Sequence, residues 1–301
     1  MSVSLYKVRK WAKMLTGKSI SHVSQGVGQI YSKSTTKGYY NDLTEKVTKR
    51  ALEVGEIPIS NVDTGEKIYF SIEIFQYGLG AFDLYLMDQN YDMLKNVISC
   101  ANWAVENQQP DGSWVTFTYE NPEHPYSSMA QSEGISLLLR ANLATGEKKY
   151  LDAAVSAKNF MLRPISEGGT TEYRGEDVCF FECTHDPLIL NGWIFSIWGL
   201  YDYTKCIEDP EAEVVLHKTL ESLKKKIPEF DIGYWSNYEE GGKRICSPFY
   251  HKLHIAQLRA MYDLFGDEIY KTYADKWEGY QNKFWNPKVA FVKKAMQKIF
   301  E

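Results

Sequence analysis

The chain has few cysteines, and their arrangement excludes a disulfide scaffold. Five Cys occur in 301 residues, at positions 100, 179, 183, 206 and 246. An odd and irregular set of this kind predicts reduced thiols in a cytoplasmic protein. Cys179 and Cys183 are four residues apart, but without a second pair of ligands they do not predict a zinc site.

The chain also lacks an excess of basic residues and any long apolar run. Its formal net charge is −5, whereas nucleic-acid-binding proteins present strongly basic surfaces, so no nucleic-acid partner is expected. No segment is apolar for long enough to span a bilayer. Residues 1–15 are basic and amphipathic but lack the apolar core and cleavage site of a signal peptide.

Two interpretations of residues 1–15 remain open. We favour an ordinary first helix with a charged, solvated face. The alternative is a helix that rests on an anionic membrane, which would place a cytoplasmic protein at the inner membrane face. A homodimer is also left open.

Several catalytic motifs are absent. The sequence contains no P-loop, no dinucleotide-binding glycine motif, no nucleophile elbow and no HExxH. No cofactor and no metal ligand are predicted, and a structural metal in the extended region is left open.

From about residue 72 the chain repeats a unit of two amphipathic helices. Gln76, Gln131, Asn191 and Gln257 mark the four units and are 55, 60 and 66 residues apart. Such helix pairs cannot bury their apolar faces alone, so they stack into a solenoid or close into a toroid. We predict a mainly α fold, an α/α barrel (toroid) of about four helix pairs.

The predicted catalytic domain covers residues 71–301. Residues 1–70 are predicted to form an N-terminal helix and a small extended or β element near residues 62–70. Within the pairs, Gly146 and Gly266 are predicted to end one helix, and the acidic residues that follow them to start the next.

Three long loops join one pair to the next, at residues 108–114, 163–187 and 228–250. Each follows the second helix of a pair, so all three should lie at the same end of the barrel, which becomes the candidate active face. Its candidate residues are Tyr173, Arg174, Glu176, Asp177, Glu182, His185, Asp186, Asn191, Tyr234, Tyr238, Lys243, Arg244, Tyr250, His251 and His254.

Two features of this face favour chemistry over simple packing. Glu182 follows two Phe residues, and apolar surroundings raise a carboxyl pKa toward a useful value; the alternative is a Glu that points to solvent or caps a helix. Tyr250, His251 and His254 open a helix at spacings that can share one face. The two His are expected to form hydrogen bonds rather than to bind a metal, because no further ligand is near in sequence.

Four dispersed motifs carry a resemblance to a known family. They are Gln76-Tyr77-Gly78-Leu79, Met129-Ala130-Gln131 with residues 135–141, Leu190-Asn191-Gly192 with residues 199–202, and Tyr250-His251 with residues 254–258. In this order they resemble the D-glucuronyl C5-epimerases, which convert glucuronate to iduronate within a polysaccharide. The resemblance covers most of the chain from about residue 70.

The resemblance implies an α/α barrel with an added β region, and it implies site residues. The catalytic Tyr of the family falls on Tyr250. A second active-site Tyr falls on Tyr238, with Tyr234 as the competing alignment. The Glu-Tyr pair of the family falls on Glu182-Cys183, where this sequence departs from the family because Cys183 replaces the Tyr.

The implied reaction is C5-epimerisation of D-glucuronate to L-iduronate within a polysaccharide or a lipid-linked oligosaccharide. It removes a proton next to a carboxylate and returns one on the other face of the ring, so it needs two groups and a stabilised enediolate. Glu182 and Tyr250 are the predicted acid/base pair, with the direction of transfer left open. A Tyr that abstracts a proton would need a lowered pKa, supplied by His251, His254 or Arg244.

The remaining predicted contacts concern the substrate, a glucuronate-containing polysaccharide. Arg244 or Lys243 would hold the uronate carboxylate, Asn191 and Tyr238 would orient the sugar, and the other predicted substrate-binding residues are His251, His254, Tyr234 and Gln131. The rival functions are a polysaccharide lyase and a catalytically inactive glycan-binding homologue. A glycoside hydrolase is a weaker rival, because Glu182 would need Asp186 or Glu176 as the second carboxylate.

Overall fold

The computed structural model describes residues 13, 19–61 and 65–300, with the side chains of residues 298–300 left out. The predicted first helix, residues 1–15, therefore lies outside the described residues except for residue 13. No helix of the described part is both long and apolar enough to cross a membrane.

The described part is mainly helical, as predicted. Its α-helices are α2 (Thr44–Thr48), α3 (Ser71–Asp88), α4 (Tyr91–Asn107), α5 (Ser128–Thr145), α6 (Lys148–Leu162), α7 (Leu190–Cys206), α8 (Pro210–Lys226), α9 (Pro248–Phe265), α10 (Glu268–Gln281) and α11 (Asn286–Phe300). The pairs α3–α4, α5–α6, α7–α8 and α9–α10 lie where the repeat predicts helix pairs.

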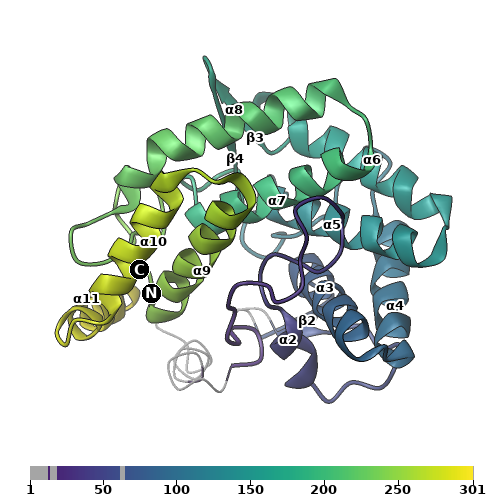
Figure 1. Ribbon diagram of the computed structural model, residues 1–301, viewed down its shortest axis with the longest axis horizontal. Coiled ribbons are helices and arrows are strands. Elements are labelled where there is room, and N and C mark those ends of the chain that lie inside the picture. Colours follow the sequence, from purple (N-terminus) through teal and green to yellow (C-terminus); the bar gives the residue numbers. More distant parts are fainter. Residues whose placement is uncertain (1–12, 14–18, 62–64, 301) are drawn as a thin grey trace.

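The four pairs are arranged in two layers. Contacts run from α3 to α5, from α5 to α7 and from α7 to α9, which form the inner row, while α4, α6, α8 and α10 cover it from outside (Figure 1). Inner helices are buried along most of their length; in α5 every residue from Ser128 to Ala141 is buried. Helices α5 and α7 approach each other closely, because a Cβ on Gly199 would lie 2.5 Å from Cα of Ser132.

Helix ends follow the capping rules. Gly146 and Gly266 adopt left-handed backbone conformations, with φ of +74° and +78°, at the C-caps of α5 and α9. This confirms the two predicted stops. The hydroxyls of Ser127 and Ser247 accept hydrogen bonds from the first turns of α5 and α9, which fixes where these helices begin.

The N-terminal segment, residues 19–48, lies between α9 and α3, the two ends of the inner row (Figure 1). Tyr31 donates a hydrogen bond to Asp263 of α9 over 2.9 Å, and Lys46 forms a buried ion pair with Glu73 of α3 over 2.8 Å. The inner row is thus an arc of helices bridged by this segment. Closure into a true α/α toroid stays a prediction, as does the domain boundary near residue 70.

A fully buried ion pair anchors the same segment to α5 and α7. Arg140 donates to Asp202 over 2.6 Å and also to the carbonyls of Lys37 and Gly38. The Tyr40 hydroxyl donates to the second oxygen of Asp202. A buried pair is tolerated when its remaining donors and acceptors are satisfied, and here the N-terminal backbone satisfies them.

Two short antiparallel hairpins complete the fold. Strand β2 (Lys67–Ile68) lies within residues 62–70, where an extended element is predicted, and it pairs with β1 (Ser60–Asn61) just before that range. Strands β3 (Thr171–Arg174) and β4 (Asp177–Phe180) pair from Thr171 with Phe180 to Arg174 with Asp177. The second hairpin lies within the loop of residues 163–187, which the sequence predicts only as a loop. Short 3₁₀ turns, η1 (Ile165–Glu167) and η2 (Ile227–Phe230), follow α6 and α8.

Candidate active site

A cavity of about 210 Å³ lies at the N-terminal ends of the inner helices. Glu182, Asn191 and Tyr250 line it, so three of the predicted site residues share one space. The other lining residues are Ser21, His22, Gln25, Lys46, Ser60, Asn61, Phe70, Ile72, Glu73, Gln76, Phe117, Tyr119, Met129, Phe195, Phe249 and Leu253.

All four inner helices begin at this cavity. Ile72, Met129, Asn191 and Phe249 each line it and each stands second in its helix, in α3, α5, α7 and α9. A helix N-terminus carries a partial positive charge and unpaired N–H groups. Four such ends direct partial positive charge at the cavity, which is also lined by the carboxyl groups of Glu73 and Glu182.

Glu182 is held in place from two sides. The Phe181 carbonyl just before it accepts a hydrogen bond from Ser128 N–H over 3.0 Å, and the Asn191 amide donates to its carboxylate over 3.3 Å. The carboxylate packs on Gly192, where an added Cβ would lie 2.5 Å from Cβ of Glu182 and closer still to its Oε2. This contact explains the small residue in Leu190-Asn191-Gly192.

The surroundings of Glu182 raise its pKa to about 7. The largest cause is burial, and the nearby carboxylates of Asp186 and Glu120 add to it, while Arg244 and the Asn191 hydrogen bond oppose it. A carboxyl group with such a pKa can accept a proton near neutral pH and release it again. The apolar context of Glu182 in the sequence points in this direction.

Tyr250 lies in the first turn of α9, after the N-cap Ser247 and Pro248. Its ring meets that of Tyr238 edge-on, with the centroids 4.9 Å apart, and its hydroxyl lies 3.5 Å from Nε2 of His22. Burial and the charge of Glu182 raise the pKa of Tyr250 well above its usual value. The lowered pKa expected for an abstracting Tyr is therefore not found, and Tyr250 is a neutral phenol.

The two His after Tyr250 lie in the core rather than at the cavity. His251 Nδ1 accepts a hydrogen bond from Ser236 N–H, its Nε2 donates to the Trp277 carbonyl, and its ring stacks on Trp235 at 3.6 Å. His254 is fully buried beside Ser236. Burial lowers the pKa of His251 to about 4 and that of His254 to about 3, so both are neutral. In place of the predicted substrate contact, they attach the loop of residues 231–247 to α9 and α10.

Other predicted binding residues support the site from outside. Arg244 pairs with Asp186 over 2.9 Å and with Glu239, and its guanidinium lies 5.5 Å from the centre of the Tyr238 ring. Gln131 is fully buried; it accepts a hydrogen bond from Trp114 N–H and donates to the Gly112 carbonyl, which fixes the loop before α5. Arg244, Gln131 and Tyr238 do not line the cavity.

Lys243 and Tyr234 lie farther from the cavity lining. Lys243 is exposed, and its carbonyl accepts a hydrogen bond from Gln297 of α11. The Tyr234 ring lies 4.9 Å from the ammonium of Lys293. The hairpin candidates Tyr173, Arg174 and Glu176 are exposed as well. The structure therefore concentrates the candidate chemistry on Glu182, Asn191 and Tyr250, with Tyr238 and Arg244 packed behind them.

Comparison with known proteins identifies the family. Residues 112–279, more than half of the chain, match the family model described as D-glucuronyl C5-epimerase C-terminus. The chain belongs to this family. This C5-epimerase match contains Glu182, Asn191 and Tyr250.

Two relatives are similar over part of their length. An uncharacterized protein of Methanocaldococcus jannaschii is 31% identical over 156 residues, which are 50% of this chain and 50% of that protein. The D-glucuronyl C5-epimerase of Caenorhabditis elegans is 28% identical over 213 residues, which are 60% of this chain and 34% of that protein. The matched region thus spans a third to a half of these curated relatives.

Several cavity residues belong to the N-terminal segment, outside the match to the C5-epimerase family. They include His22, which faces Tyr250, and Lys46, which is buried against Glu73 and the Ser21 carbonyl. Sequence reasoning missed them, because neither residue lies in a motif and their position depends on contacts far along the chain. The sequence does contain an indication that Glu73 lies near the site, because Glu73 precedes the motif residue Gln76 by about one helical turn.

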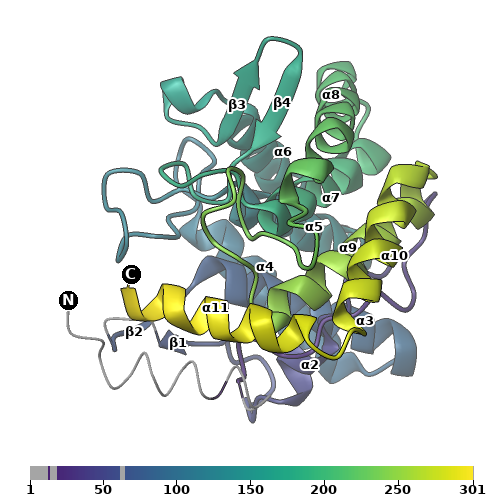
Figure 2. The same ribbon diagram turned by 90° about the vertical axis from the view of Figure 1, so that its left-hand side faces the viewer.

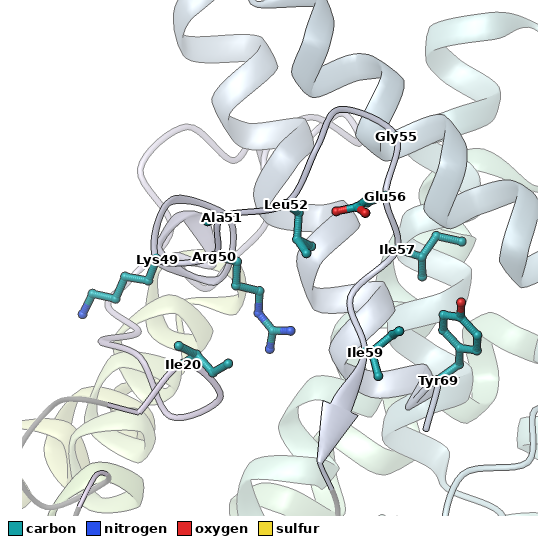
Figure 3. A pocket seen from close by; sticks show the side chains of 10 residues that line it. All are labelled: Ile20, Lys49, Arg50, Ala51, Leu52, Gly55, Glu56, Ile57, Ile59 and Tyr69. Atoms are coloured by element: carbon teal, nitrogen blue, oxygen red, sulfur yellow. The ribbon is translucent and has the colours of Figure 1, made fainter. Parts of the chain in front are cut away.

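A larger and more open groove, about 560 Å³, adjoins the cavity. Three pairs of consecutive residues connect the two spaces: Ile20, Ile59 and Tyr69 line the groove, and the residue after each of them lines the cavity. Figure 3 shows the groove, with the Arg50 side chain between those of Ile20 and Ile59 and the Tyr69 ring beyond. The Tyr69 side chain is exposed.

The described residues offer no group of three or more His, Cys, Asp or Glu side chains that could hold a metal ion. All five cysteines are free thiols, and burial raises the pKa of Cys183 well above its usual value. Cys183 is thus a protonated thiol beside Glu182 and supplies neither a base nor a nucleophile at neutral pH.

Proposed function

We propose that the protein epimerises D-glucuronate to L-iduronate at C5 within an anionic polysaccharide or lipid-linked oligosaccharide. The observation that carries this proposal is that Glu182 and Tyr250, an ionisable carboxylate and a neutral phenol, line one cavity. Membership of the C5-epimerase family supports the reaction class. The closed α/α toroid implied by the resemblance belongs to the same proposal.

Glu182 is the base in the direction from glucuronate. Because its pKa is about 7, the Glu182 carboxyl group is ionised in a large fraction of the protein molecules at neutral pH. The hydrogen bond from Asn191 orients the carboxylate. It removes the C5 proton, and the electron pair of the C–H bond passes into the adjacent carboxylate to form an enediolate. General-base catalysis is most effective with a pKa near the working pH, which this carboxyl group has.

Tyr250 is the acid in the same direction. Its raised pKa keeps the phenol protonated, so it can deliver a proton to C5 from the other face of the ring. The phenolate that results then recovers a proton from solvent, and Glu182 releases the one it took. The sequence leaves open which group abstracts and which donates. Burial raises both pKa values, which leaves Glu182 ionisable near neutral pH and keeps Tyr250 protonated, and this difference favours the assignment.

The charge of the uronate and of the enediolate is met by the helix ends. The N-termini of α3, α5, α7 and α9 surround the cavity, and Lys46, which is paired with Glu73, also lines it. Such fixed dipoles stabilise charge that develops in the transition state without having to reorganise. The ion pair predicted for Arg244 or Lys243 with the substrate is replaced in this proposal, since neither lines the cavity.

The neighbouring groove favours a polymer over a single sugar. The C–H face of a sugar can pack on an exposed ring such as Tyr69, and the cation Lys49 lies on the same groove. We propose that a residue of the glycan next to the reacting uronate occupies it. The cavity then holds the reacting uronate and the groove extends the contact along the chain.

The test is NMR of glucuronate-containing polymers, heparosan among them, incubated with the protein in heavy water. Deuterium at C5 together with new iduronate signals is the expected result. A new unsaturated uronate would instead show a lyase, in which the same proton is taken but the C4 substituent leaves. Binding without any exchange would show a glycan-binding protein without this activity. The variant Tyr91→Phe, at an exposed Tyr that begins α4 and does not line the cavity, is the matched control for Tyr250→Phe.

A further inference from the structure

Helix α11 is attached to the rest of the protein by one narrow face. Ala290 is fully buried, and Lys294 is 7% exposed. Gln297 accepts a hydrogen bond from Ile245 N–H over 3.1 Å and donates to the Lys243 carbonyl over 2.7 Å. Positions 290, 294 and 297 follow the helical spacing of four and three, so they form one side of the helix.

A second face of α11, together with the residue before it, is apolar and exposed. Trp285 is 68% exposed, Val289 41%, Val292 54% and Met296 52%. Their spacing of four, three and four residues places them in one stripe along the helix. Phe284, beside the start of this stripe, is 69% exposed. Isolated exposed apolar residues are ordinary, but an aligned row that begins with Trp285 and has a second exposed ring, Phe284, beside it marks a surface that contacts something apolar.

Lysines border this stripe on both sides. At 100° per residue, Lys288 and Lys293 fall on opposite flanks of the row formed by Trp285, Val289, Val292 and Met296. Both are exposed, and the ammonium of Lys288 lies 3.4 Å from the centre of the Phe284 ring. Residues 282–300 contain five Lys and neither Asp nor Glu, in a chain of net charge −5. This element therefore carries a net positive charge.

We propose that α11 lies on an anionic lipid surface, with Trp285, Val289, Val292 and Met296 inserted among the acyl chains. An apolar face with aromatic residues, bordered by Lys and free of acidic residues, is the pattern of helices that lie in the plane of a membrane interface. A protein partner would equally cover the apolar row, but the lysines on both flanks favour a surface that is negative on all sides. Figure 2 shows α11 lying across the lower part of the face of the molecule that is turned to the viewer.

This surface is connected to the candidate active site through the backbone. Gln297 of α11 holds Lys243 and Ile245, which flank Arg244, and the Arg244 guanidinium packs against the Tyr238 ring. The inference does not depend on the proposed reaction, because it rests on exposure and charge alone.

The experiment is cosedimentation of the full chain with vesicles of phosphatidylcholine alone and of an equal mixture with phosphatidylglycerol. Binding to the mixed vesicles and not to the neutral ones is expected. The double variant Val292→Ser with Met296→Ser should lower the affinity by roughly tenfold or more, as expected for removing apolar groups that insert into the membrane. Lys288→Ala should lower it by roughly fivefold, the effect of one lysine near an anionic surface.

The matched control is Leu143→Ser, which removes an equally exposed apolar side chain, 63% exposed, from the end of α5. It should leave vesicle binding unchanged, and circular dichroism should show all variants folded. Absence of binding to mixed vesicles, or equal binding by the double variant, would overturn the proposal. Light scattering of the protein without vesicles supplies a second check: a dimer that the double variant dissociates would assign the apolar row to a second copy of the chain and overturn it as well.

Discussion

The Asn191 side-chain amide donates a hydrogen bond to the Glu182 carboxylate over 3.3 Å. The same carboxylate packs against the backbone of Gly192, the next residue of α7. Two consecutive residues in the first turn of one helix thus fix the position of the candidate base. The motif Leu190-Asn191-Gly192 therefore positions the Glu182 carboxylate. Asn191 supplies a hydrogen-bond donor, and the missing side chain of Gly192 leaves space for the carboxylate.

Gly192→Ala should displace Glu182 and reduce turnover by roughly a hundredfold, because misplacing a catalytic group by about 1 Å has an effect of this size. The added methyl group would meet the Glu182 side chain at 2.5 Å or less. Gly279→Ala in α10 is the matched control, since nothing lies within 4 Å of an added Cβ there. The control should retain full activity and the fold. Equal activity of the two variants would show that the contact between Gly192 and Glu182 does not affect turnover.

The rate of epimerisation should rise with pH through an apparent pKa near 7. Glu182 must be ionised to accept the C5 proton, and its pKa is raised to about 7. Asp186→Asn should shift the profile to lower pH, because it removes a carboxylate that raises this pKa and releases Arg244, which lowers it. The measurement is kcat/KM between about pH 5 and 9. A profile that moves to higher pH in the variant would contradict the assignment of Glu182.

Glu182→Gln should stabilise the fold above pH 7 while removing activity. A carboxyl group whose pKa is higher in the folded protein than in the unfolded chain contributes stability at low pH and loses it between the two pKa values. For Glu182 this window runs from its ordinary value of 4.5 to about 7. At pH 8 the variant should gain about 1–3 kcal/mol in urea unfolding.

The same unfolding experiment at about pH 4 should show little or no gain from Glu182→Gln, since the wild-type carboxyl is then neutral in both states. Glu176→Gln is the control, because the Glu176 side chain is 86% exposed, so its charge is not buried on folding. A pH-independent gain would mean that the substitution acts through packing rather than through the charge of Glu182.

Tyr69→Ala should weaken the binding of long substrates and leave the binding of short substrates unchanged. The Tyr69 ring lines the groove beside the cavity and does not line the cavity itself. Loss of a stacking surface lowers affinity by roughly tenfold or less. KM measured along a series of oligosaccharides should therefore diverge from the wild type only beyond the length that reaches the groove. An equal change in kcat for every length would contradict this role.

Much of the scaffold could be predicted from the sequence, because it depends on local signals. The spacing of Gln76, Gln131, Asn191 and Gln257 indicates the helix pairs, and Gly146 and Gly266 indicate two helix ends. The apolar surroundings of Glu182 could also be predicted, since two Phe residues directly precede it.

The parts of the site that the sequence does not predict depend on contacts between distant segments. His22 reaches Tyr250 across more than two hundred residues, and Lys46 reaches Glu73 through the fold. Spacing alone places His251 and His254 with Tyr250, but helix α9 is covered on that side by Trp235 and Trp277, so the two imidazoles are buried. A polar side chain at helical spacing is thus not evidence for exposure when a loop folds over it.

The most direct test of the proposed division of labour is deuterium exchange at C5 of glucuronate in heavy water, followed by NMR for three proteins. The wild type should incorporate deuterium and form iduronate. Tyr250→Phe should still exchange the C5 proton of glucuronate through Glu182 but form no iduronate, whereas Glu182→Gln should do neither. Iduronate formed by Tyr250→Phe, or exchange into glucuronate by Glu182→Gln, would contradict the assignment of the base to Glu182 and of the acid to Tyr250.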